Sequence, residues 1–149
     1  MKEEILEFVE DMCDTAGFEL DVDVEASDND SGDFRVVLSG PDRGLLLSRG
    51  AELLDALEYI TSRAFGKQMR HDAKIVFDSG NYRHMREVEL QLMAGKGAER
   101  VRASRAPFTF EAMSPSERRI IHLALADDAT VRTESVGEGA DRKVRIIPA

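Results

Sequence analysis

The chain has 149 residues and a mass of 16.6 kDa, enough for one ordinary domain or two small ones. Hydrophobic residues make up 42% and charged residues 33%, a composition that excludes collagen-like, mucin-like and wholly disordered chains. The net charge of −9 argues against an anionic membrane or a nucleic acid as the partner of the chain taken as a whole.

The charge is unevenly distributed along the chain. Residues 1–80 have a net charge of −11, and residues 81–149 have a net charge of +2. This shift predicts a domain boundary near the middle and places any contact with a polyanion in the second half. Cys13 is the only cysteine, so no intrachain disulfide can form, and we expect an inert, buried or half-buried thiol. The chain shows no metal-ligand spacing, and we expect no cofactor.

Nothing in the sequence predicts targeting or membrane insertion. The first residues are acidic and mixed, unlike a signal or transit peptide, and the longest aliphatic run is Leu45-Leu46-Leu47. Crossing a bilayer takes about 20 apolar residues. We therefore expect a soluble, cytoplasmic protein.

The first half predicts the element order helix, strand, strand, helix, strand. An amphipathic helix over residues 3–16 is followed by strands over 18–24 and 34–38, joined by a turn over 27–33. A turn over 39–50 leads into a second helix over 50–65, and a short strand covers 74–77. The buried face of this second helix is predicted to consist of Leu53, Leu54, Leu57, Ile60 and Ala64.

The second half predicts two helices and three strands. A long helix covers residues 81–104, and Gly95 and Gly97 within it are expected to weaken or bend it. A short strand over 108–110 precedes a capping box, with Ser114 as the N-cap and Glu117 reaching back to it. The helix that starts there runs to about residue 126. A hairpin of strands 130–135 and 143–147 follows.

Arg118 and His122 form the sharpest local pattern. They lie four residues apart, so they share one face in the first turns of the helix. Spare backbone N–H groups and the positive end of the helix dipole favour phosphate there. Arginine offers a planar fork for phosphate oxygens, and histidine a second donor or a stacking ring. The alternative is an exposed arginine and a histidine whose hydrogen bonds are satisfied locally.

The second half resembles the R-three-H domain, a single-stranded nucleic-acid-binding fold. The resemblance rests on residues 115–122 (PSERRIIH), 133–137 (TESVG) and 142–144 (RKV), with the NYRHMR stretch at 81–86 upstream. The order and spacing are similar to those of the bacterial Jag family, also called KhpB or SpoIIIJ-associated proteins. The nucleic-acid-binding residues that this resemblance and the local chemistry indicate are Arg118, His122, Arg119, Thr133, Ser135, Arg142, Lys143, Arg83 and Arg86.

Jag proteins place a KH domain before the R-three-H domain. Residues 1–78 fit the αββααβ order of a type II KH fold, and residues 79–149 would form the R-three-H domain with its linking helix, giving an α+β protein. KH domains clamp nucleotides with a Gly-x-x-Gly loop. Here the loop reads Leu47-Ser48-Arg49-Gly50, so a leucine replaces the first glycine and is expected to hinder close approach of a phosphate backbone. Ser48, Arg49 and Gly50 remain as the candidate contacts of this loop.

The leading hypothesis is a non-enzymatic protein that binds single-stranded RNA, with single-stranded DNA left open. Ser116 and His122 do not face each other on a helix, and no nucleotide-binding loop is present, which argues against an enzyme. The resemblance implies post-transcriptional regulation linked to cell elongation or division, and either a small KH-only partner or self-association through the KH-like half. The alternative is a protein-interaction adaptor whose KH-like half has lost RNA binding and docks a partner.

Overall fold

Two hydrophobic cores divide the chain. The computed structural model describes residues 1–149, and its internal contacts group Met1–Arg83 into a first unit and His84–Ala149 into a second. Each unit has its own cluster of buried side chains. The two units are therefore described separately.

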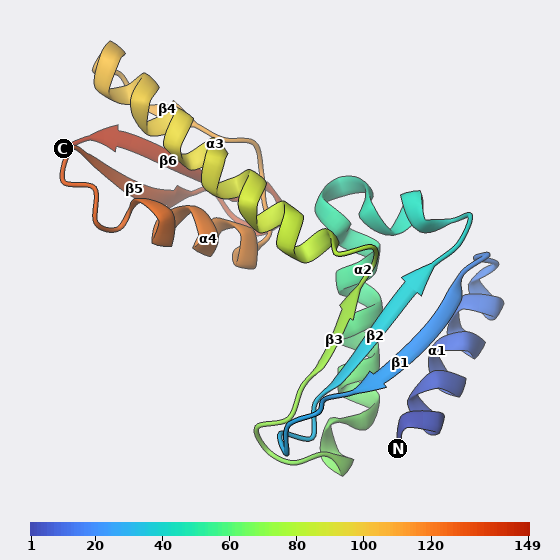
Figure 1. Ribbon diagram of the computed structural model, residues 1–149. Coiled ribbons are helices and arrows are strands. Elements are labelled where there is room, and N and C mark those ends of the chain that lie inside the picture. The colour runs from blue at the N-terminus through green and yellow to red at the C-terminus, as the bar shows by residue number, and fades with distance from the viewer. The chain divides into compact units, whose positions relative to one another are not determined.

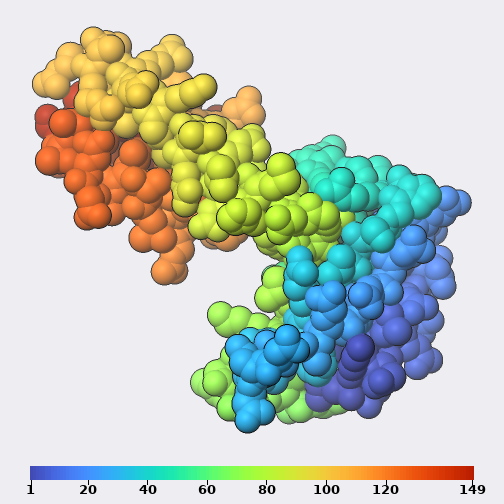
Figure 2. Space-filling model, viewed as in Figure 1, coloured from blue at the N-terminus to red at the C-terminus, as the bar shows by residue number.

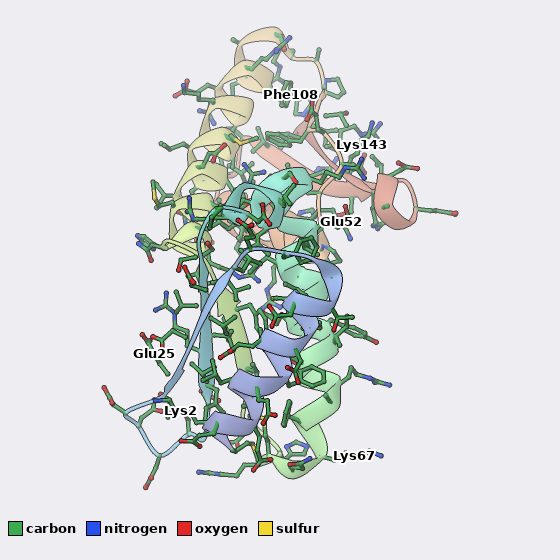
Figure 3. The ribbon with its side chains drawn as sticks, turned by 90° about the vertical axis from the view of Figure 1, so that its right-hand side faces the viewer. Lys2, Glu25, Glu52, Lys67, Phe108 and Lys143 are labelled. Carbon is green, nitrogen blue, oxygen red and sulfur yellow. The ribbon has the colours of Figure 1, made fainter.

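The first unit is a three-stranded sheet with two helices on one face. It contains α1 (Lys2–Ala16), β1 (Asp21–Ala26), β2 (Phe34–Ser39), α2 (Arg43–Phe65), the short 3₁₀ helix η1 (Gly66–Gln68) and β3 (Ile75–Asp78). The strand order is β1-β2-β3, with β1 antiparallel and β3 parallel to β2. Figure 3 shows α1 and α2 on the same side of these strands, where they cover buried residues such as Val36 and Phe77.

Helix α2 is interrupted near its start. Ser48, Arg49, Gly50 and Ala51 have non-helical backbone angles, and the last three have positive φ. Residues 43–47 thus form a short separate helix where the sequence predicts a turn. With this break the first unit has the predicted αββααβ order.

The predicted buried face of the second helix is wrong at its C-terminal end. Leu54 and Leu57 are buried as predicted, but Thr61 and Phe65 continue the buried face, while Ile60 is 46% exposed and Ala64 lies at the surface. Steps of three and four residues from Leu54 lead to Thr61 and Phe65. The hydroxyl of Thr61 is satisfied by the carbonyl of Leu57, 2.8 Å away, so this polar side chain can be buried.

The second unit packs two helices on a small antiparallel sheet, as predicted. Its elements are α3 (Tyr82–Ser104, which starts just before the unit boundary), β4 (Phe108–Thr109), α4 (Pro115–Leu125), β5 (Val131–Val136), the 3₁₀ helix η2 (Gly139–Asp141) and β6 (Lys143–Pro148). The strand order is β4-β6-β5. Figure 1 shows α3 and α4 running alongside this sheet.

Helix α3 is continuous through both glycines, so the predicted weakening produces no break. Gly95 is exposed, whereas Gly97 is buried in line with Leu90, Ala94 and Val101. Gly97 therefore belongs to the packed face of α3. None of the helices is both long and apolar enough to span a bilayer.

Candidate nucleic-acid interface

Helix α4 is fixed at its start and along one face. The side chain of Ser114 accepts a hydrogen bond from the backbone N–H of Glu117, and Pro115 occupies the first turn, as the capping pattern predicts. Ile121 and Leu125 are buried with Glu117. Arg118 directly follows the buried Glu117, and His122 directly follows the buried Ile121, so both lie at the edge of the buried face.

Strand β5 presents two hydroxyl groups on its inner face. Thr133 and Ser135 are paired across the ladder with Ile146 and Val144 of β6, both of which are fully buried. Residues paired across an antiparallel ladder share one face of the sheet. The two hydroxyls therefore face the same side as the core and the helices.

His122 joins α4 to β5 through both of its ring nitrogens. Nδ1 lies 2.7 Å from Oγ1 of Thr133, and Nε2 lies 2.8 Å from Oγ of Ser135. The half-buried ring is thus held in one orientation by two hydrogen bonds. The histidine therefore has its hydrogen bonds satisfied locally, as the alternative interpretation expects. The same two bonds bring together three residues predicted to bind nucleic acid, His122, Thr133 and Ser135.

Two arginines lie near this ring. Arg118 donates through Nη1 to the carbonyl of Met113 at 2.6 Å, and Arg142 donates through Nη1 to the carbonyl of Gly137 at 2.6 Å. The backbone carbonyl of Arg142 in turn accepts from the N–H of Met113 at 3.2 Å. Neither guanidinium is in an ion pair in the structure.

Both arginines act electrostatically on His122. Partial burial lowers the pKa of His122 below its ordinary value of 6.5, and the positive charges of Arg118 and Arg142 lower it further. The imidazole is therefore neutral at pH 7. We refer to Arg118, His122, Thr133, Ser135 and Arg142 as the α4–β5 cluster.

Two of the other predicted residues lie outside this cluster. Arg119 is exposed, about 100° around α4 from Arg118. Figure 2 shows α4, in orange, at the surface of the second unit. Lys143 is paired with Val136, so its side chain belongs to the outer face of the sheet, opposite to Thr133 and Ser135.

Arg83 is engaged within the first unit. Its guanidinium donates to Asp55 at 2.8 Å, to Glu58 at 3.1 Å and to the carbonyl of Phe77 at 2.9 Å. Burial works against its charged form, but the hydrogen bond to Asp55 and the neighbouring carboxylates raise its pKa overall. Glu58 also accepts the N–H of Phe77 at 2.9 Å, so together these two side chains cover the free edge of β3.

Arg86 is engaged by carboxylates of the second unit. Its Nε donates to Glu117 at 2.7 Å, and its Nη1 donates to Glu89 at 2.9 Å. Glu117 is only 8% exposed, so Arg86 compensates the charge of a buried carboxylate. The predicted capping box is therefore half formed, because the Glu117 side chain turns to Arg86. The sequence did not reveal the Arg86–Glu117 pair, because the capping box already explained the presence of a glutamate at position 117.

In the loop of the first unit, the positive φ angles fall after Leu47 rather than on it. Leu47 packs partly buried against the core and keeps a helical backbone, so the absence of glycine there causes no strain. The positive φ angles fall on Arg49 (54°), Gly50 (66°) and Ala51 (63°). Ser48, Arg49 and Gly50 are all exposed, and the hydroxyl of Ser48 donates to the carbonyl of Leu45 at 3.1 Å.

Comparison with known proteins identifies the second unit. Residues 88–148 match the family model of the R-three-H domain. The chain is 33% identical over 146 residues to the RNA-binding protein KhpB of Clostridium symbiosum, covering 98% of this chain and 65% of that protein. It is 32% identical over 114 residues to the RNA-binding protein KhpB of Bacillus subtilis (strain 168), covering 75% of this chain and 55% of that protein. The chain thus spans about two thirds and about half of the lengths of these relatives. The second unit contains an R-three-H domain. The similarity to the two KhpB proteins supports a relationship of the chain to the Jag/KhpB family.

Proposed function

We propose that the chain is a member of the Jag/KhpB family and binds single-stranded nucleic acid, RNA in the first place, through the α4–β5 cluster. The R-three-H match and the names of both relatives support RNA binding rather than an enzymatic activity. The observation that carries the proposal is the meeting of two arginines without carboxylate partners and two hydroxyls around one histidine.

This arrangement has the chemistry of a phosphate site. Arg118 and Arg142 each use one hydrogen bond to a carbonyl, so further N–H donors of each guanidinium are free to meet phosphate oxygens. Hydroxyl groups and backbone N–H groups near a helix start add neutral donors. Because few charges act and the chain is acidic overall, affinity should be modest, and it should fall with salt by a shallow slope that the two arginines determine.

We also propose that the first unit is a type II KH-like domain, with residues 1–78 and 79–149 as the two domains. Its αββααβ order and its one parallel strand pair support this assignment. From the family we infer a cytoplasmic protein that acts in post-transcriptional regulation linked to cell elongation or division. A small KH-only protein or a second copy would then be its protein partner.

The proposal is tested by fluorescence anisotropy with a labelled single-stranded RNA of about 12 nucleotides, at two salt concentrations. Arg118→Ala and Arg142→Ala should each weaken binding and reduce the salt slope by about one. Arg132→Ala is the charge-matched control, because Arg132 is exposed on the outer face of β5. Equal losses in all three variants would indicate only a general charge effect and would contradict a site at the cluster.

A second candidate function is docking of a protein partner by the first unit. The charge of −11 over residues 1–80 repels phosphate, and Leu47 fills core space instead of opening the loop. Light scattering on nucleic-acid-free protein tests this role. A dimer that persists without RNA favours it, and a monomer that changes only when RNA is added argues against it.

A further inference from the structure

We propose that His122 is a positioning residue that acts on RNA through the hydroxyls of Thr133 and Ser135 rather than by direct contact. The ring bonds to both hydroxyls, at 2.7 and 2.8 Å, and so has no ring N–H left for a phosphate oxygen. This inference rests on the proposed function and gives His122 a role different from that of the two arginines beside it.

The protons on the neutral ring determine what each hydroxyl can offer. A neutral imidazole has one N–H donor and one acceptor nitrogen, and a hydroxyl has one proton to donate. The hydroxyl facing the acceptor nitrogen must spend its proton on the ring. The hydroxyl facing the ring N–H accepts that bond and keeps its own proton. One of Thr133 and Ser135 is therefore left as a donor toward a phosphate oxygen.

Protonation of the ring would change this count. An imidazolium has two N–H donors, so both hydroxyls would accept from the ring and both would keep a proton for phosphate. The ring would also gain a positive charge. RNA binding and protonation of His122 should therefore favour each other.

The charged groups around the ring oppose protonation in the free protein. From its own helix the ring feels Arg118, and from the turn before β6 it feels Arg142, while β5 contributes only the two neutral hydroxyls. Bound phosphate would neutralise part of this positive field. We therefore expect RNA to raise the pKa of His122 and acidification to strengthen binding.

A double-mutant cycle separates the indirect role from direct contact. In the wild-type background, His122→Ala should lower RNA affinity several-fold at neutral pH. In the Thr133→Val/Ser135→Ala background the same change should alter affinity by less than about twofold, because its targets are gone. Additive losses would show that His122 contacts the RNA on its own and would overturn the inference. Circular dichroism of each variant verifies that it is folded.

The ring itself provides a readout independent of affinity. NMR correlation of ring protons and nitrogens in the full chain should show a single neutral tautomer of His122 without RNA. RNA should raise its pKa, while His84, exposed on α3, serves as the internal control. A mixture of tautomers, or a pKa that RNA leaves unchanged, would overturn the positioning role.

Binding measured as a function of pH completes the test. Between about pH 5 and 8, wild type and His84→Gln should bind more tightly as pH falls, beyond the general trend that His122→Gln retains. The label should be a rhodamine, whose emission does not titrate in this range. If the wild type binds no RNA, the proposed function fails. If it binds and Arg118→Ala weakens binding but His122→Gln keeps the full pH response, only this inference fails.

Discussion

Gly97 on α3 lies so close to Ile146 on β6 that a Cβ at position 97 would stand 2.8 Å from Cδ1 of Ile146. The Cζ atom of the Phe110 ring would be 3.0 Å from the same added Cβ. Helix α3 therefore approaches the sheet more closely than any residue with a side chain would allow. The helix tolerates a glycine in its interior because the absence of a side chain lets the core of the second unit close.

The two glycines of α3 should respond in opposite directions to alanine. Gly97→Ala should lower the free energy of unfolding of the second unit by about 1–3 kcal/mol, because Ile146 or the helix must move. At position 95 the new methyl group of Gly95→Ala would have no atom within 4 Å, so this change should raise the free energy of unfolding by about 0.5–1 kcal/mol. Hydrogen exchange of the β6 amides reports this unit directly. Equal effects at both positions would contradict the close packing.

The loop of the first unit contains backbone strain that glycine would relieve. Arg49 has φ of 54° and is exposed, so Arg49→Gly loses no packing and should stabilise the unit by about 1 kcal/mol. Ala56→Gly, at an exposed helical position of α2, should destabilise it by a similar amount. Both tyrosines, Tyr59 and Tyr82, belong to this unit, so urea unfolding followed by tyrosine fluorescence reports its stability. Destabilisation by both changes would show that residue 49 is not strained.

The contacts of Arg83 predict a structural effect on the first unit. Arg83→Met removes the partner of Asp55 and Glu58 and uncovers the carbonyl of Phe77, and should cost about 1–2 kcal/mol. Lys67→Met, at an exposed position of η1, removes the same charge and should change stability by less than about 0.5 kcal/mol. The same tyrosine signal measures both. An unchanged midpoint for Arg83→Met would indicate that these contacts contribute nothing to stability.

The lowered pKa of His122 makes the stability of the second unit depend on pH. Because the folded state holds this proton more weakly than the unfolded chain, the unfolded chain is protonated first as pH falls. The contribution of His122 is therefore fully present above its ordinary pKa of 6.5 and is lost as pH falls through the folded-state value. Comparison with His122→Gln, by hydrogen exchange of β6 over this range, isolates the effect. An identical pH dependence in the variant would contradict the lowered pKa.

Much of the fold could be predicted because local signals agreed. The alternation in residues 21–24, the turn at 27–33 and the cap at Ser114 each specify an element without help from distant residues. The buried face of α2 could not be read correctly beyond Leu57, because Ile60 and Thr61 exchange the roles that their hydrophobicity suggests. Burial of Thr61 depends on its bond to a backbone carbonyl, which composition does not reveal.

The candidate site was predictable in part for a similar reason. Helical spacing related Arg118 to His122, and strand alternation related Thr133 to Ser135, but their meeting around one ring depends on how α4 packs on β5. The sheet register, which is not visible in the sequence, separates Lys143 from Thr133 and Ser135. Charge alone likewise could not distinguish the arginines of the cluster from Arg83 and Arg86, whose partners are carboxylates of distant segments.

RNA is proposed to bind the second unit at the α4–β5 cluster. The most direct measurement is a titration of the isotope-labelled full chain with single-stranded RNA, followed by the backbone amide and arginine side-chain NMR signals. We predict that the largest shifts occur at Arg118, His122, Ser135 and Arg142 and decrease when salt is raised. Shifts confined to residues 48–50 of the first unit, or no shifts at all, would contradict it.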